Sequence, residues 1–170
     1  MSATDPQTTL RPLVLRPAAA ADSADLFEWR NQPHVRAFSH NPQVIPWETH
    51  QAWFQAALQN PARILLIGEQ DQAPVGVLRY DLTADTAVVS VYLTPGSAGR
   101  GLGAQLLRQG SQWLQAHHPA IVRIHADIQP ANAASQKAFE RAGYRRIQPP
   151  AGAPDATHAT GCLLYEAVLA

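Results

Sequence analysis

Residues Pro95–Leu107 read Pro-Gly-Ser-Ala-Gly-Arg-Gly-Leu-Gly-Ala-Gln-Leu-Leu. An apolar, β-branched run, Val88–Leu93, comes just before this stretch, and an amphipathic run, Ala104–Leu114, comes just after it. The pattern predicts a strand, a glycine-rich turn and a helix. Glycines let a ligand approach the main chain, and a helix N-terminus offers free N–H groups and a positive dipole end. The stretch therefore indicates a diphosphate site with one cation, Arg100, and the alternative is a tight connection without a ligand.

Two well-known phosphate-binding motifs do not fit this turn. A P-loop ends in Gly-Lys-Ser/Thr, whereas Gly103 is followed by Ala104 and Gln105. A dinucleotide fingerprint reads Gly-x-Gly-x-x-Gly near the first strand, whereas the glycines here have a different spacing and lie past the middle of the chain.

The composition predicts one folded domain of ordinary size. The 170 residues include 13 basic and 13 acidic side chains without a long basic run, so nucleic acid is not an expected partner. The single cysteine, Cys162, argues against a disulfide framework and a cysteine-rich metal site, and no metal ligands are predicted. Residues 1–9 are polar and are expected to form a disordered tail before a domain over residues 10–170. Without a signal-like start or an apolar run of membrane length, we expect a cytoplasmic protein that does not bind membranes.

Apolar runs separated by turn residues predict the order β-α-α-β-β-β-α-β-α-β-β. The strands on either side of the central helix should pair in parallel by the right-handed crossover rule, and the other neighbours should be antiparallel. The irregular segment His34–Pro46 leaves room for a short helical piece at His34–Phe38. The first expected helix has Asp22 or Ser23 as its N-cap and ends at Arg30. The other expected helices are Trp47–Gln59, Gly103–His117 and Ala133–Ala142, and the expected strands are Leu13–Arg16, Arg63–Glu69, Pro74–Leu82, Thr86–Thr94, Ile121–Ile128, Arg145–Gln148 and Cys162–Leu169.

A second motif reads Asn132-Ala-Ala-Ser-Gln-Lys-Ala-Phe-Glu-Arg-Ala-Gly-Tyr144. Together with Val89–Gly103, it resembles the two acetyl-CoA motifs of the GCN5-related N-acetyltransferase (GNAT) superfamily, at the family's separation of one helix and one strand. The resemblance covers about Leu13–Leu169. It implies an α/β (α+β) fold in which a mixed, mostly antiparallel sheet of six to seven strands carries helices on both faces, with its two central parallel strands splayed apart.

The resemblance implies that acetyl-CoA binds between the splayed strands. Its pantetheine arm would pair with the main chain at the end of the first strand, its pyrophosphate would bind N–H groups of the glycine turn, and Asn132 would bond the pantetheine amides. Ser135 and Lys137 would reach a phosphate, and the alternative for both is a solvated helix face. The expected cofactor residues are Tyr92, Leu93, Thr94, Ala98, Gly99, Arg100, Gly101, Leu102, Gly103, Ala104, Asn132, Ser135 and Lys137.

The sequence departs from the family pattern at two positions. Ala98 stands where the first motif has Arg or Gln, so one phosphate-binding side chain is missing and Arg100 is the candidate to replace it. Phe139 stands where many members have a Tyr that protonates the leaving thiolate, so no acid can be assigned there.

Catalytic candidates therefore come from elsewhere in the chain. Direct transfer to an amine needs a base, and the strand before the turn holds no carboxylate. His125 and Asp127 alternate onto one face of their strand, and His50 lies on an early helix of the kind that builds the family's acceptor site. Tyr92 is a candidate acid or acceptor contact. The alternatives are a polar face under a helix for the first two and a packed histidine for His50.

The early segment indicates an acceptor. Glu28-Trp-Arg-Asn31, Val35-Arg36 and His50-x-x-Trp53-Phe54 loosely resemble a GNAT subgroup with sugar-nucleotide 4-amino acetyltransferases and ribosomal-protein N-terminal acetyltransferases. Tryptophans can stack on a sugar or base and arginines can bind phosphates, so the expected acceptor-binding residues are Trp29, Arg30, Arg36 and Trp53, with core anchors and structural ion pairs as the alternative.

These features predict an N-acetyltransferase that acts on a primary amine of a small molecule, with a nucleotide-linked amino sugar as the favoured acceptor. The alternatives are a protein N-terminal acetyltransferase and a catalytically silent acyl-CoA-binding module. Family members often form homodimers, and nothing in this sequence demonstrates one.

Overall fold

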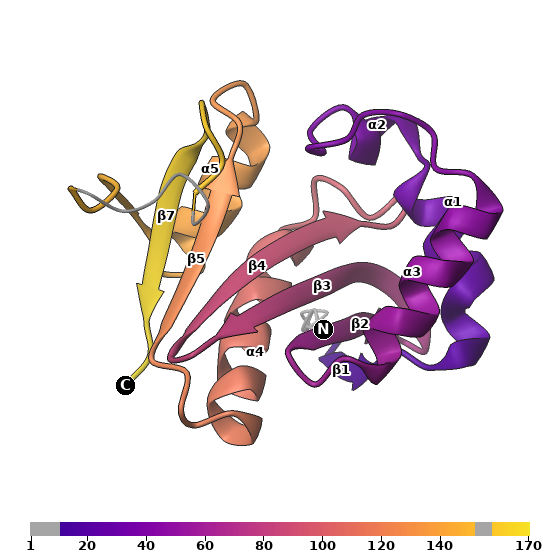
Figure 1. Cartoon of the computed structure of the whole chain (residues 1–170), viewed down its shortest axis with the longest axis horizontal. Coiled ribbons are helices and arrows are strands. Elements are labelled where there is room, and N and C mark those ends of the chain that lie inside the picture. The colour runs from indigo at the N-terminus through magenta and orange to yellow at the C-terminus, as the bar shows by residue number, and fades with distance from the viewer. Residues whose placement is uncertain (1–10, 152–157) are drawn as a thin grey trace, which may run out of the picture.

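The computed structural model describes residues 11–151 and 158–170, so the tail predicted at residues 1–9 lies outside the described residues. The domain predicted over residues 10–170 remains a prediction. The elements follow the expected order (Figure 1). The strands are β1 (Leu13–Pro17), β2 (Arg63–Gln70), β3 (Ala73–Thr83), β4 (Thr86–Leu93), β5 (Arg123–Ile128), β6 (Arg145–Ile147) and β7 (Leu163–Val168), and the helices are η1 (Ala20–Asp22), α1 (Ser23–Arg30), α2 (Pro33–Arg36), α3 (Trp47–Gln59), α4 (Leu102–His117) and α5 (Ala133–Arg141).

The described strands form one sheet in the order β1-β2-β3-β4-β5-β7-β6. The pair β4–β5, on either side of α4, is parallel, and the other neighbouring pairs are antiparallel. The predicted mixed sheet is therefore confirmed. The short helix α2 begins at Pro33 and not at the expected His34, because proline's fixed φ and missing N–H suit the first helical position.

The two parallel strands separate soon after they meet. Thr86, Ala87 and Val88 of β4 pair with β5, and no pairing continues beyond Val88 in the described ladder. From there β4 stays with β3, while β5 runs with β7, and the two ribbons diverge (Figure 1). One edge of β4 is thus left open toward its carboxyl end, which confirms the predicted splay.

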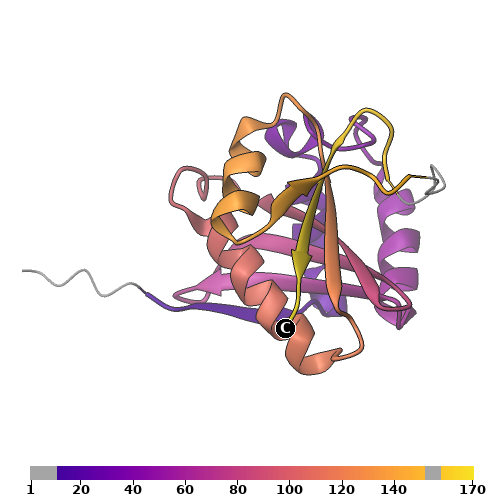
Figure 2. The same ribbon diagram turned by 90° about the vertical axis from the view of Figure 1, so that its left-hand side faces the viewer.

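Helices cover both faces of the sheet. Helices α4 and α5 lie on one side of it, and α1 and α3 lie on the other (Figure 2). The larger core forms under α4, where Leu106, Leu107 and Leu114 are completely buried. A smaller core joins Phe54 of α3 to Ile67 of β2 and other apolar side chains of α1, β2 and β3. In the described part of the chain, no helix is long and apolar enough to cross a membrane.

The packing of α4 on the sheet requires glycine at position 110. A Cβ placed on Gly110 would lie 2.2 Å from the Tyr80 hydroxyl and 2.7 Å from a methyl group of Leu78. The Tyr80 hydroxyl is buried and has no hydrogen-bond partner among the described residues. The absence of a side chain at position 110 therefore sets how closely α4 approaches β3.

We predict that Gly110→Ala lowers the free energy of unfolding by about 1–3 kcal/mol, because overpacking outweighs the better helix propensity of alanine. Tyr80→Phe should be close to neutral, because it removes a hydroxyl without a partner. The double variant should recover part of the loss, since the nearest clashing atom is gone. Denaturant unfolding of the three variants measures these values, and a Gly110→Ala variant as stable as the wild type would contradict the packing argument.

Candidate active site

A cleft of about 680 Å³ lies in the opening between β4 and β5. Its walls come from the segment α1–α3, the end of β4, the glycine turn, the end of β5 and the start of α5. The predicted site residues that line it are Arg30, His50, Trp53, Tyr92, Leu93, Ala98, Gly103, Asp127, Asn132 and Ser135. The structure does not bring the following predicted residues to the lining: Trp29, Arg36, Thr94, Gly99, Arg100, Gly101, Leu102, Ala104, His125 and Lys137.

The glycine turn is shaped by backbone conformation. Gly96, Gly99 and Gly101 have φ values of 79°, 76° and 72°, a left-handed region that favours glycine. Gly101 is the N-cap of α4 and no side chain caps this helix, so its first N–H groups have no side-chain acceptor. Gly103, in the first turn of α4, lines the cleft. The arrangement places main-chain donors and a helix N-terminus at the mouth of the cleft, where they can bind an anion.

Neither Arg100 nor Lys137 lines the cleft. The Arg100 guanidinium donates to the Gln70 side chain at 2.9 Å, and Lys137 is exposed on α5. Their predicted contacts with the diphosphate stay predictions, and the donors that the structure presents at the cleft mouth belong to the main chain.

Leu93 turns its main-chain N–H and C=O toward the cleft and away from β3. The Thr94 N–H donates to Val75 O at 3.0 Å and its hydroxyl donates to Pro74 O at 3.0 Å, so Thr94 is tied to β3. Because residues alternate in direction along an antiparallel pair, the N–H and C=O of Leu93 point away from β3, toward the opening. Of the three residues expected to pair with pantetheine, Leu93 is the one whose main-chain N–H and C=O face the cleft.

His34 was not found from the sequence. Its Nε2 lies 3.1 Å from the Leu93 carbonyl oxygen and the residue lines the cleft, so α2 is fastened to the open end of β4. The sequence carried no signal for this contact, because the two residues are 59 positions apart and the segment around His34 has no periodic pattern.

Asn132 organises the start of α5. Its Oδ1 accepts from the Ser135 N–H at 3.2 Å, as an N-cap does, and its Nδ2 donates to the Ser135 hydroxyl at 3.0 Å. Both side chains line the cleft. The amide is thus placed for the predicted cofactor contact while it also stabilises the helix.

We predict that Asn132→Ala and Asn132→Asp separate these two roles. The alanine variant loses the cap and should lose about 1 kcal/mol of stability, whereas Asp is a good N-cap and should not. If the Asn132 amide also binds the cofactor, both variants should bind CoA more weakly in calorimetry. Wild-type CoA affinity in Asn132→Asp would leave capping as the residue's role.

His50 is a packed histidine whose ring nitrogen is already engaged. The side chain is buried, and its Nε2 donates to the Ser23 carbonyl at 2.9 Å. Its ring stacks on Phe54 with centroids 5.6 Å apart and lies among Phe27, Trp47 and Trp53. Burial lowers the pKa of His50, because the charged imidazolium is poorly solvated there. The environment fits the packed alternative, and its use as a base stays a prediction.

The lowered pKa of His50 predicts a pH-dependent stability. The unfolded chain binds a proton near its normal pKa of about 6.5, whereas the folded chain binds it only at lower pH. The contribution is therefore present above about pH 6.5 and is lost as the pH falls below it. Thermal unfolding at pH 7.5 and 5.5 should show a smaller drop for His50→Gln than for the wild type. The exposed His117→Gln is the control, and an equal drop in all three proteins would contradict the prediction.

His125 and Asp127 have different surroundings on β5. His125 does not line the cleft, and its Nε2 lies 2.8 Å from Glu166 Oε2 on β7. Asp127 does line it, and accepts from His158 Nδ1 and from the Ala159 N–H. Asp127 is the one carboxylate in the lining within the described ranges, so it is the acid side chain best placed to take a proton from an acceptor.

Among the described residues that line the cleft, Tyr92 is the one tyrosine. Burial raises the pKa of its hydroxyl well above the ordinary value, so the group stays protonated and can donate. Phe139 is buried in the cleft wall and meets Tyr144 edge-to-face, with centroids 4.9 Å apart. Tyr144 lies outside the lining, so it does not replace the hydroxyl that position 139 lacks.

The predicted acceptor residues divide into two groups. Arg30 and Trp53 line the cleft, and the Arg63 guanidinium lies over the Trp53 ring, 5.7 Å from its centroid. Arg36 instead donates to two main-chain carbonyls of neighbouring loops, and Trp29 packs against the smaller core. Trp29 therefore fits its alternative as a core anchor. Arg36 bonds main-chain carbonyls and does not form the ion pair that was its alternative.

Arg79 on β3 also lines the cleft and was not found from the sequence. Its Nη2 lies 3.4 Å from the Ser90 hydroxyl of β4. The sequence feature that could have indicated Arg79 is a cation within a largely apolar predicted strand.

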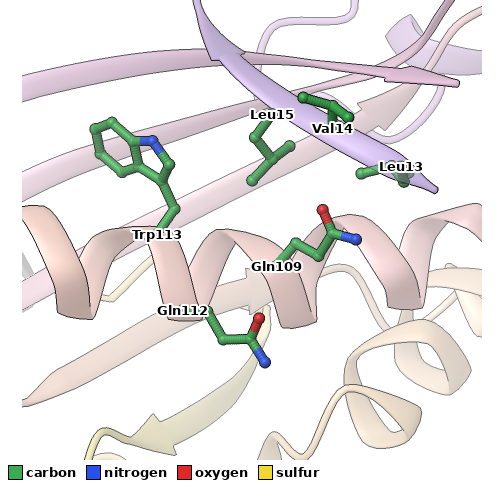
Figure 3. Close-up of a pocket in the computed structure, with 6 residues that line it drawn as sticks. All are labelled: Leu13, Val14, Leu15, Gln109, Gln112 and Trp113. Atoms are coloured by element: carbon green, nitrogen blue, oxygen red, sulfur yellow. The ribbon is translucent and has the colours of Figure 1, made fainter.

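A second depression of about 410 Å³ lies between β1 and α4, where Gln109 and Trp113 extend from the helix toward the strand (Figure 3). Its six lining residues include no titratable side chain. The described residues also contain no group of three or more His, Cys, Asp or Glu side chains suited to a metal ion. The cleft between β4 and β5 is therefore the candidate active site.

A mixed sheet that opens between two parallel strands, with main-chain donors at the mouth and polar side chains within, is the arrangement of an acyl-transferring enzyme of the kind that the two motifs predict. The sequence profile of a family described as "Acetyltransferase (GNAT) domain" matches residues 12–145. The chain belongs to this family and is an N-acetyltransferase by family. Among curated proteins, none gives a significant sequence match.

Solved structures share the fold at low sequence identity. An aminoglycoside acetyltransferase AAC(6')-Ib in complex with coenzyme A and kanamycin aligns with a TM-score of 0.75 and 20% identity, over 92% of this chain and 95% of that chain. A spermidine N-acetyltransferase from Vibrio cholerae, in complex with CoA and spermine, gives 0.75 and 11% over the same shares. A GNAT-family acetyltransferase from Streptococcus pneumoniae gives 0.70 and 16%, over 94% and 100%.

Proposed function

We propose that this chain transfers an acetyl group directly from acetyl-CoA to a primary amine of a small molecule. One observation carries the proposal: a single cleft runs from the open N-terminus of α4, past the Leu93 N–H, to a far wall built by the segment α1–α3 and by β3. The CoA complexes of the aminoglycoside and spermidine acetyltransferases that share this fold support acetyl-CoA as the donor.

The cleft contains a group for each step of the transfer. The Leu93 N–H faces the opening and polarises the thioester carbonyl, so that it stabilises the oxyanion as the amine attacks. Asp127 takes the proton that the amine must lose, directly or through a water molecule. The C–S bond breaks, and the Tyr92 hydroxyl donates a proton to the leaving thiolate. No acyl-enzyme is formed in this scheme.

The favoured acceptor is a nucleotide-linked amino sugar, as in the subgroup that the early segment resembles. Trp53 supplies an aromatic surface and Arg30 supplies a cation on the wall opposite β5. Both side chains suit a ligand that combines rings with phosphate groups.

A catalytically silent acyl-CoA-binding module is the second candidate. Two observations favour it: Ala98 leaves the turn without the family's phosphate-binding side chain, and the phenyl ring of Phe139 occupies the wall where many members have a hydroxyl. Thiol release from acetyl-CoA with a panel of sugar-nucleotide amines, simple amines and peptide N-termini distinguishes the candidates. Tight CoA binding without turnover on any amine would favour the silent module, and turnover with peptides alone would favour protein N-terminal acetylation.

For the catalytic groups, we predict that Asp127→Asn and Tyr92→Phe each lower kcat by about 100-fold, the lower end of what general acid–base catalysis contributes. The KM for acetyl-CoA should change little, because neither group is expected to bind the pyrophosphate. Asp85→Asn, which removes an exposed carboxylate at the β3–β4 turn, is the matched control and should keep the wild-type rate. Unchanged kcat in Asp127→Asn would remove it as the base.

A further inference from the structure

The far wall of the cleft carries two guanidinium groups with little compensating negative charge. Arg30 at the end of α1 and Arg79 on β3 both line the cleft. Each also has a side-chain nitrogen that is buried and has no hydrogen-bond partner among the described residues, Nη1 of Arg30 and Nε of Arg79.

Arg30 has only a neutral partner, and Arg79 shares its one carboxylate partner with a second arginine. Arg30 makes no salt bridge within the described residues, and its Nη2 donates to the Asn41 carbonyl at 3.0 Å. Arg79 Nε lies 3.1 Å from Asp81 Oδ2 without hydrogen-bond geometry. Asp81 is shared, because Arg63 Nε donates to its other oxygen at 2.5 Å. One carboxylate thus faces two guanidinium groups on β2 and β3, and Arg30 adds a third positive charge.

The electrostatics of the wall also indicate an excess of positive charge. Burial lowers the pKa of Arg30, the neighbouring Tyr92 opposes this effect, and the charges of Arg79 and Arg36 lower the pKa further, although the guanidinium stays protonated at neutral pH. Arg30 is half-buried, and each of the two side chains has one nitrogen that is cut off from solvent without a partner among the described residues, an arrangement that an anionic ligand would stabilise. The Arg79 side chain is 36% exposed, so a ligand in the cleft can reach it.

We propose that Arg30 and Arg79 form an anion-binding subsite in the acceptor end of the cleft, so that the acceptor is an amine that also bears a carboxylate or a phosphate. The proposal rests on the proposed acetyl transfer and narrows its substrate class. A polycationic amine does not suit this wall, because it would meet two guanidinium groups, and the one carboxylate of the described lining, Asp127, already accepts two hydrogen bonds.

Matched acceptors test the subsite by acetylation kinetics. Glucosamine 6-phosphate is compared with glucosamine, and alanine with alaninamide, with spermidine as a cationic acceptor. We expect the anionic member of at least one pair to have a kcat/KM at least tenfold higher than its neutral partner, and the pair that responds identifies phosphate or carboxylate as the anion. Equal or better turnover of the neutral members and of spermidine would overturn the proposal.

Variants then assign the effect to the two side chains. Arg30→Gln and Arg79→Gln should each raise the KM for the anionic acceptor about tenfold or more, the usual effect of losing one charge-assisted hydrogen bond, while the KM for acetyl-CoA stays unchanged. Arg123→Gln, which changes an exposed arginine of β5 outside the lining, is the control and should match the wild type. Equal KM values in all four proteins would overturn the assignment.

A binding measurement keeps the subsite testable without turnover. In the CoA-saturated protein, inorganic phosphate or acetate should raise the unfolding temperature in a concentration-dependent way, and the rise should be lost in Arg30→Gln and Arg79→Gln but kept in Arg123→Gln. This result without acetylation of any amine would uphold the subsite and refute the proposed transfer. Acetylation without anion preference, together with no stabilisation by either anion, would refute the subsite and uphold the transfer.

Discussion

The early separation of β4 from β5 is the constraint on which the rest of the structure depends. The two strands pair through Val88 of β4 and His125 of β5 and then leave each other. A continuous ladder would bury the edge of β4 and bond its main chain. The separation instead leaves Leu93 facing the opening and brings Asp127 and Asn132 to the opposite wall. The proposed donor binding, acceptor binding and proton transfer all use the space that the missing pairings create.

The glycine turn and α5 complete this opening by different means. The turn relies on positive φ angles and main-chain donors, so its capacity to bind an anion depends little on which side chain stands at Ala98. The start of α5 relies on one side chain, Asn132, which caps the helix and faces the cleft. The turn side of the opening thus depends on backbone conformation, and the α5 side depends on the side-chain amide of Asn132.

Much of the fold could be predicted from local signals. Trp47–Gln59 was predicted with its observed bounds because Pro46 and Asn60-Pro61 delimit it. The parallel pairing of β4 and β5 follows from the handedness of a crossover connection. The site was less accessible to sequence reasoning. The contact of His50 with Ser23 and the pairing of Arg79 with Ser90 join different elements of the chain, and no pattern within either element reports such a contact.

The bond between His34 and the Leu93 carbonyl ties the proposed donor end of the cleft to the proposed acceptor end. A pantetheine arm that pairs with Leu93 competes with His34 for the same oxygen, and His34 belongs to the segment that also positions Asn41 beside Arg30. Under the proposed function, filling the donor site would therefore release one anchor of the wall assigned to the acceptor. Such a coupling favours an ordered sequence of substrate addition, in which the thioester enters before the amine.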